Sequence, residues 1–97
     1  MATAPAIQSL ALTDRFKRDY KRLDAGLQAM VDDILRNDFM PWPRHCRRHH
    51  TLSGYRPTVH VIDVTSNHSH QITFNLDGTV ARLLRVGTHK QISRDPG

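Results

Sequence analysis

The sequence predicts an α+β fold in which two helices pack on one face of a mostly antiparallel sheet of four to five strands. Apolar residues recur with helical spacing over residues 14–36, and they alternate with polar residues from residue 47 onward. Turn residues separate the alternating segments, as they do in hairpin-connected strands. Helices followed by a run of such strands are typical of α+β proteins. We expect a single domain that spans residues 1–97.

The first part of the chain is predicted to form a short strand and two helices. Residues 7–12 are apolar and lie between Pro5 and Thr13, which indicates a strand. Thr13 or Asp14 can then cap a first helix. The apolar side of this helix has i, i+4, i+7 spacing and consists of Phe16, Tyr20 and Leu23. Asp24 can cap a second helix that ends near residues 37–38, before a loop that contains two prolines.

Four further strands are predicted over residues 47–52, 58–65, 71–76 and 80–86. The turns between them are Ser53-Gly54, residues 66–69 and Asp77-Gly78, of which Asp-Gly is the strongest hairpin signal. Residues 94–97 have no pattern and are expected to form a tail.

The charge is concentrated in the second part of the chain. The formal net charge is +5, and residues 1–38 hold equal numbers of basic and acidic residues. All seven histidines lie between His45 and His89, in the same region as the excess arginine. A solvated basic face is the simplest explanation. Because the charge gathers where the histidines are, however, we favour an anionic partner, most simply a nucleic acid.

The chain has no feature of a secreted or membrane protein. Cys46 is the only cysteine, so no disulfide can form within the chain, which fits a reducing compartment. No basic leader opens the sequence, and no apolar run approaches the roughly 20 residues that a transmembrane helix needs. We expect a cytoplasmic protein without a membrane partner.

Histidines and arginines together suit the cleavage of RNA. Cleavage without a metal needs a base for the 2′-hydroxyl proton, an acid for the leaving 5′-oxygen and cations for the phosphorane charge. The 2′-hydroxyl is the nucleophile, so DNA should be inert. The candidate acids and bases are His50, His60 and His89, and the candidate cations are Arg56, Arg85 and Lys90. A histidine in an alternating strand, such as His60, is by itself more often a solvent-facing residue.

Two segments resemble the RelE/ParE superfamily of bacterial type II toxins. Residues 50–63 contain His-x-Leu and Gly-Tyr-Arg-x-x-x-His, and residues 84–92 contain Gly-Thr-His. These elements are most similar to the YafQ branch, and Phe-Lys-Arg-Asp-Tyr-Lys-Arg-Leu after the first strand is also typical. The resemblance implies a ribosome-dependent mRNA endonuclease without a cofactor. It also implies a cognate antitoxin partner and, together with the antitoxin, binding to operator DNA.

The resemblance also implies roles for individual residues. His50 and His60 match candidate bases, His89 matches a candidate acid or phosphate ligand, and Arg56 matches an arginine that contacts the scissile phosphate. Asp63 stands near a family aspartate. It follows His60 by three positions, which in a regular strand places the two on opposite faces. The residues expected to bind RNA are Arg47, Arg48, Arg85 and Lys90.

Some assignments remain open at this stage. The family has an aromatic residue where this chain has Ser93, which puts base stacking there in doubt. Tyr55 and Trp42 can stack on bases, although a core or loop-anchor role is the simpler interpretation. The four remaining histidines (His45, His49, His68 and His70) are treated as surface residues.

Three other functions compete with the nuclease. A zinc site could use Cys46 with neighbouring histidines, although structural zinc usually takes more cysteine. A ParE-type gyrase inhibitor shares the fold but has no comparable set of titratable residues. A catalytically silent relative that binds the antitoxin as a corepressor is the third alternative.

Overall fold

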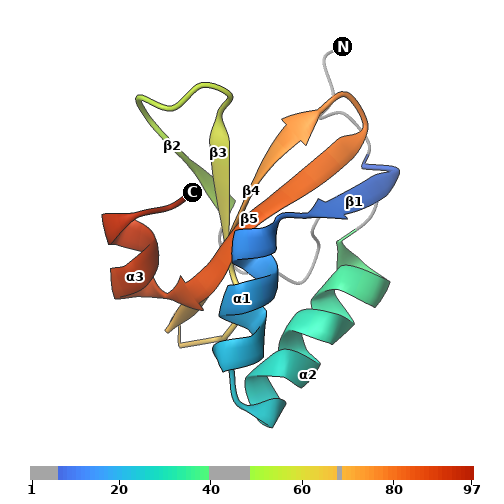
Figure 1. The fold of residues 1–97 in the computed structure, drawn as a ribbon, viewed down its shortest axis with the longest axis vertical. Helices are drawn as coiled ribbons and strands as arrows, with labels where there is room; N and C mark the ends of the chain where they lie inside the picture. Colours follow the sequence, from blue (N-terminus) through green and yellow to red (C-terminus); the bar gives the residue numbers. More distant parts are fainter. Residues whose placement is uncertain (1–6, 40–48, 68) are drawn as a thin grey trace.

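The structure is a computed structural model, and it describes residues 7–39, 49–67 and 69–97. Its elements in chain order are β1 (Ser9–Leu12), α1 (Asp14–Arg22), α2 (Ala25–Asp33), the π-helical turn η1 (Ile34–Asp38), β2 (His49–Leu52), β3 (Val59–Asp63), β4 (His70–Asp77), β5 (Val80–Thr88) and α3 (His89–Arg94). The strands form one sheet in the order β1-β5-β4-β3-β2 (Figure 1). Among the strands of the described residues only the β1–β5 pair is parallel, and the arrangement confirms the predicted α+β fold.

The two N-terminal helices begin where the sequence predicts. The hydroxyl of Thr13 accepts the Phe16 N–H at 3.1 Å and starts α1, so Thr13 rather than Asp14 is the cap. The carboxylate of Asp24 accepts the Leu27 N–H at 2.8 Å and starts α2. A cap of this kind stabilises a helix by about 1 kcal/mol. In the described part of the chain, no helix is long and apolar enough to cross a membrane.

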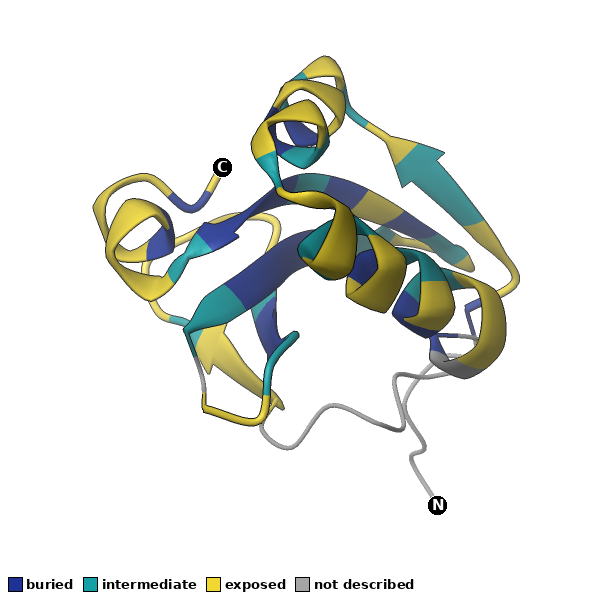
Figure 2. Cartoon of the chain, turned by 90° about the horizontal axis from the view of Figure 1, so that it is seen from below, coloured by how far each residue is buried: buried dark blue, intermediate teal, exposed yellow. Residues whose placement is uncertain are grey.

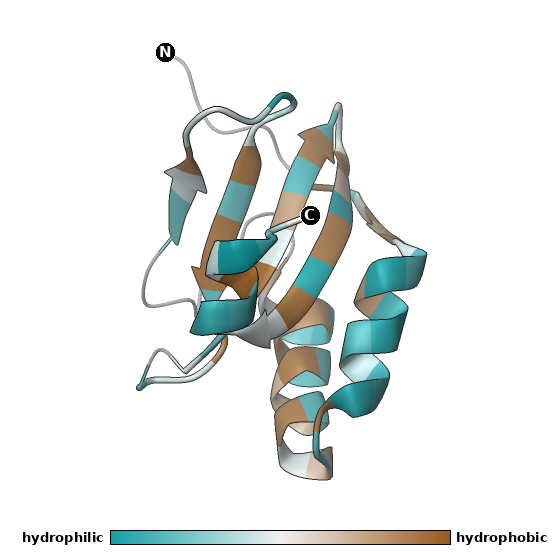
Figure 3. Cartoon of the chain, turned by 60° about the vertical axis from the view of Figure 1, so that its left-hand side comes forward, coloured by the Kyte–Doolittle hydropathy of each residue, from teal (hydrophilic) through white to brown (hydrophobic). Residues whose placement is uncertain are grey.

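The main core lies between these helices and one face of the sheet, here called the helix face. Buried apolar residues from both layers form it: Phe16, Val31, Ile34, Phe39, Ile62, Ile72, Phe74, Leu83 and Val86. Phe39 and Phe74 meet edge to face with ring centroids 5.1 Å apart. Figure 2 shows the buried strands between helices whose outer sides are exposed. Hydrophobic and hydrophilic residues alternate along the strands (Figure 3), as the sequence pattern predicts.

A bulge in β5 decides which residues reach the opposite face of the sheet. Phe74 pairs with Leu83, whereas Thr73 pairs with Arg85, so Leu84 is an extra residue in β5. The hydroxyl of Thr13 donates to the carbonyls of Leu83 and Leu84, at 2.8 and 3.2 Å. Because of the extra residue, Arg85 lies on the face opposite Phe74. We call this second face the α3 face, because α3 packs on it.

Arg85 forms a buried ion pair with Asp19 of α1. Its guanidinium donates to both carboxylate oxygens of Asp19, at 2.9 and 3.0 Å, and both side chains are almost fully buried. The same carboxylate accepts the Val86 N–H at 3.3 Å. The pairing of β1 with β5 ends at Leu83. Beyond that point Asp19 of α1, instead of β1, accepts a backbone N–H of β5.

The C-terminal residues are not a free tail, as the sequence suggested, but a packed helix and its extension. Ile92 of α3 and Pro96 are buried. The hydroxyl of Thr73 donates to the Pro96 carbonyl at 2.7 Å, and Arg85 donates to the Asp95 carbonyl at 3.0 Å. Six residues are too few for an amphipathic pattern to stand out, so this helix is not visible in the sequence.

Removal of Asp19 should destabilise the fold strongly. Asp19→Ala leaves the buried Arg85 guanidinium and the Val86 N–H without their partner, and we expect a loss of about 3–5 kcal/mol. Asp14→Ala, in the exposed first turn of the same helix, is the control and should cost less than about 1 kcal/mol. Urea unfolding followed by circular dichroism measures both variants. Equal losses for the two would contradict a special role for the ion pair.

Candidate active site

The register of the sheet places His50 on the α3 face. His50 pairs with Val61, Val61 with Thr73, and Thr73 with Arg85, so the four residues form one row across the sheet. Residues in one row of paired strands share a face. The row continues towards the C-terminal extension, because Thr73 and Arg85 both donate hydrogen bonds to it.

His50 and His89 line a common hollow of about 260 Å³ between the sheet and α3. We call it the His50–His89 hollow. Its lining comes from β2, the loop after β2, the α3 face and the C-terminal segment: His50, Leu52, Ser53, Tyr55, Val61, Gln71, His89, Ile92, Ser93 and Pro96. Two of the three histidines selected from the sequence therefore meet at one site, although they are 39 positions apart in the chain.

His89 is held at the first position of α3. The hydroxyl of Thr88 accepts the Gln91 N–H at 3.2 Å, and the Gln91 side chain accepts the Thr88 N–H at 2.9 Å. This reciprocal capping box fixes the first turn of the helix. The His89 N–H also donates to the Ser69 carbonyl at 3.1 Å. The backbone of His89 is thus fixed while its side chain is exposed.

Gln71 and Ser93 also line the hollow, and sequence reasoning did not select either of them as a site residue. Tyr55, for which a core or loop-anchor role seemed simpler, is 45% exposed and lines the hollow as well. Its phenol ring is therefore available for stacking on a base. The only sequence signal for Tyr55 is its place in the Gly-Tyr-Arg element.

Asp63 lies on the same face as His50 but behind the hollow. It is buried, and the Gln71 amide donates to its carboxylate at 3.1 Å. Gln71 lines the hollow and Asp63 does not, so this hydrogen bond connects Asp63 with the hollow.

Arg56 and Lys90 are exposed cations. In the sequence they directly follow Tyr55 and His89, which line the hollow. Neither side chain has an ion-pair partner among the residues that the structure describes. Both are therefore available to an anionic ligand. The expected RNA contacts of Arg47 and Arg48 lie outside the described residues.

Arg85 is not available for RNA, which corrects the expectation from the sequence. The residue is 9% exposed, and its guanidinium donates to Asp19 and to the Asp95 carbonyl. The sequence shows a basic residue in a basic region, but the bulge at Leu84 and the facing aspartate of α1 are tertiary features. Arg85 is therefore a structural cation.

The structure also separates His60 from His50 and His89. His60 pairs with Phe74, and its ring lies parallel to the Phe74 ring at 5.0 Å on the helix face. Nδ1 of His60 and Nε2 of His49 form a hydrogen bond of 2.9 Å. As the spacing of three indicates, His60 and Asp63 face opposite sides of the strand. The structure therefore does not support His60 as a base for the reaction at the hollow.

The surroundings of His49 and His60 keep both rings neutral. Burial lowers the pKa of His60, and the neighbouring His49 lowers it further. Burial also lowers the pKa of His49, with a smaller contribution from His50. Both lowered pKa values favour the neutral rings near pH 7, and in their mutual hydrogen bond one ring nitrogen donates and the other accepts.

The residues that the structure describes contain no group of three or more histidine, cysteine, aspartate or glutamate side chains that could hold a metal ion. His45 and Cys46, on which the zinc alternative depends, lie outside the described residues.

The neutral histidine pair predicts a pH dependence of stability. Because folding lowers both pKa values below about 6.5, the unfolded chain binds more protons, and stability falls as the pH drops below that value. His60→Phe keeps a ring on Phe74 and removes the titration of His60 while His49 still titrates, so its loss of stability between about pH 7.5 and 5.5 should be smaller than that of the wild type. Urea midpoints at the two pH values test this. An equal loss for both proteins would show that the pair is not responsible.

With this geometry established, comparisons with known proteins identify the fold. No protein-family model matches the chain, and no curated protein sequence matches it. Solved structures do match. A chain of the Escherichia coli DinJ-YafQ toxin-antitoxin complex is 19% identical over 86% of this chain and 93% of its own length, with a TM-score of 0.60. YafQ from E. coli strain BL21(DE3) is 18% identical over 86% and 94%, with a TM-score of 0.60.

A metal-bound toxin from Helicobacter pylori is 16% identical over 87% of this chain and 97% of its own, with a TM-score of 0.61. In each case the likeness spans nearly the whole of both chains, while the sequences have diverged. At such identities the likeness establishes the fold. This chain therefore has the fold of the YafQ toxin, which confirms at that level the resemblance of its sequence to the YafQ branch of the RelE/ParE superfamily.

Proposed function

We propose that this chain is the toxin of a type II toxin–antitoxin pair and that it is an endoribonuclease that cleaves mRNA, with the ribosome as the place of action. One observation carries the proposal: His50 and His89 line the same hollow. A general base and a general acid on a single scaffold are the minimum that metal-independent cleavage of RNA requires. The resemblance to YafQ supplies the substrate class.

In the proposed reaction the 2′-hydroxyl of the substrate attacks the adjacent phosphorus. His50 takes the proton of this hydroxyl, and His89 donates a proton to the 5′-oxygen as the phosphorus–oxygen bond breaks. The ring of His50 stands on a strand and that of His89 on the first turn of a capped helix. Rigid elements hold acid and base more accurately than loops do. Each group is expected to accelerate the reaction by roughly 10²–10⁴-fold.

The remaining contributions come from exposed side chains around the hollow. Arg56 and Lys90 are free to offset the charge that develops on the phosphate. Tyr55, which is half exposed, offers a ring for a base next to the cleaved bond. Asp63 holds the Gln71 amide at the back of the hollow.

The proposal includes partners for the chain. The complex of DinJ with YafQ is described as a toxin–antitoxin complex, and by analogy we expect a cognate antitoxin protein here. An acidic segment of the antitoxin would suit the net charge of +5. Together with its antitoxin, the chain is expected to bind operator DNA. We expect the toxin and the antitoxin to act in the cytoplasm, where mRNA and ribosomes are found.

Replacement of His89 should abolish most of the activity. His89→Ala removes the proposed acid and should slow cleavage by roughly 10²–10⁴-fold. His50→Ala should have an effect of similar size, and the double variant should lose less than the product of the two losses, because the residues act as a unit. Purified protein, programmed ribosomes and primer extension of the mRNA measure the rates.

His60→Phe is the matched control, because it replaces a histidine on the helix face. It should cleave like the wild type, provided circular dichroism shows that it is folded. Wild-type rates for His89→Ala would overturn the assignment of the acid. Inhibition of DNA replication before protein synthesis, with no cut transcripts, would instead favour a gyrase inhibitor.

A further inference from the structure

A second hollow, of about 310 Å³, lies on the other side of α3. We call it the Leu27 hollow. Its lining comes from α1, the α1–α2 connection, α2, the end of the sheet and the start of α3: Asp19, Arg22, Leu23, Asp24, Leu27, His70, Val86, Gly87, Thr88 and Gln91. None of these residues lines the His50–His89 hollow. A volume of about 300 Å³ is at the lower end of the range for sites that bind small molecules.

The lining combines an apolar wall with a few polar groups. Leu23, Leu27 and Val86 supply the wall, and His70 and Gln91 supply groups that form hydrogen bonds. The hydroxyl of Ser69 is 2.9 Å from Nδ1 of His70. The other ring nitrogen of His70 has no hydrogen-bond partner in the described part of the chain. Flat heterocycles bind in surroundings of this kind, with their faces on apolar side chains and their edges on polar ones.

The charges at the hollow favour a neutral ring over a phosphate inside it. Asp19 is already occupied by Arg85 and by the Val86 N–H. Asp24 caps α2 with one carboxylate oxygen and can accept further hydrogen bonds with the other. A carboxylate repels a phosphate but accepts a hydrogen bond from an amino group. The N3–H of uracil is also a donor, but it lies between two carbonyl oxygens that a carboxylate repels. The ligand that fits best is therefore a nucleobase with an exocyclic amino group.

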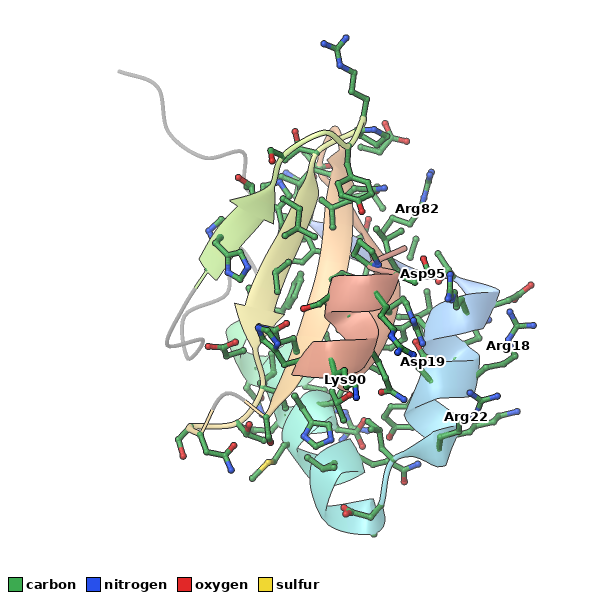
Figure 4. The ribbon with its side chains drawn as sticks, turned by 90° about the vertical axis from the view of Figure 1, so that its left-hand side faces the viewer. Arg18, Asp19, Arg22, Arg82, Lys90 and Asp95 are labelled. Carbon is green, nitrogen blue, oxygen red and sulfur yellow. The ribbon has the colours of Figure 1, made fainter. Side chains whose placement is uncertain are left out.

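Cations lie at and near the Leu27 hollow. Arg22 of α1 is one of its lining residues, and Lys90 precedes the lining residue Gln91 on α3. Figure 4 shows Arg18 and Arg22 on α1 and Lys90 on α3, with Asp19 between the two helices. None of these three cations forms an ion pair within the described residues. They can contact the phosphates that flank a base inserted between the helices.

The α3 helix connects this hollow with the proposed active site. His89 and Ser93 of α3 line the His50–His89 hollow, whereas Gln91 lines the Leu27 hollow. A helix with its side chains is about 10–12 Å across. A single RNA strand that is cleaved at His50 and His89 and crosses α3 at Lys90 therefore reaches the second hollow within a few nucleotides.

We propose that the Leu27 hollow binds a base of the RNA strand a few nucleotides from the cleaved bond and selects adenine, cytosine or guanine over uracil. This inference rests on the proposed function for the identity of its ligand. The hollow contributes to sequence preference and takes no part in the chemical step.

Nucleoside 5′-monophosphates test the hollow without any cleavage. They are titrated into the full-length ¹⁵N-labelled protein, with ribose 5-phosphate as the probe for phosphate alone. We expect amide shifts around Leu27, His70 and Gln91 with the monophosphates of adenosine, cytidine and guanosine. We also expect at least several-fold weaker binding of uridine monophosphate and no saturable shift with ribose 5-phosphate. Shifts confined to the His50–His89 hollow, or equal shifts with ribose 5-phosphate, would overturn the proposal.

A variant that fills the hollow connects it with cleavage. Leu27→Trp should abolish the nucleotide shifts and reduce the base preference at one position near the cut, while Leu27→Met, of similar volume, should retain both. An unchanged cleavage pattern for a folded Leu27→Trp protein would overturn the role in selection. If the wild type cleaves no RNA but the base-dependent shifts are present, the proposed function fails and the nucleobase site remains.

Discussion

The buried ion pair between Arg85 and Asp19 is the interaction on which the remaining arrangement depends. It joins α1 to β5 at the edge where β1 has ended, and Arg85 also holds the Asp95 carbonyl behind α3. A buried ion pair adds little net stability compared with an apolar pair of the same volume. Its effect here is geometric, because it fixes the C-terminal segment against the α3 face. The segment that follows α3 is therefore held by Arg85, whose partner Asp19 lies 66 positions away in sequence.

The sheet separates the histidines into two groups with different chemistry. His50 and His89 are exposed on the side of α3, where a substrate can reach them. His49 and His60 bind each other on the helix face, where burial favours the neutral ring. The alternation of strand side chains produces this division, because His49 and His50 are neighbours that must point in opposite directions. The adjacent residues His49 and His50 thus lie on opposite faces of the sheet, His49 on the helix face and His50 on the α3 face.

The sequence was sufficient for the elements whose signals are local. Thr13 and Asp24 identify the helix starts through their own hydrogen bonds. The Asp77-Gly78 signal marks a hairpin in which Asp77 pairs with Val80, and the turn consists of Gly78, with a φ of +61°, and Thr79. Features set by contacts between distant residues could not be predicted. The extra residue Leu84 reverses the direction of Arg85, and only the partner on α1 shows why a basic residue should be buried.

The site was predictable to the extent that motifs mark it. The Gly-Tyr-Arg and Gly-Thr-His elements locate Tyr55 and His89, but the motif match alone also selected His60, which the strand register places on the opposite face of the sheet.

The most direct test of the proposed reaction is the chemistry of the cleaved ends. Attack by the 2′-hydroxyl must leave a 2′,3′-cyclic phosphate or a 3′-phosphate on one fragment and a 5′-hydroxyl on the other. Mass spectrometry of the fragments should find these ends, and 5′-phosphate with 3′-hydroxyl ends would contradict the proposed reaction.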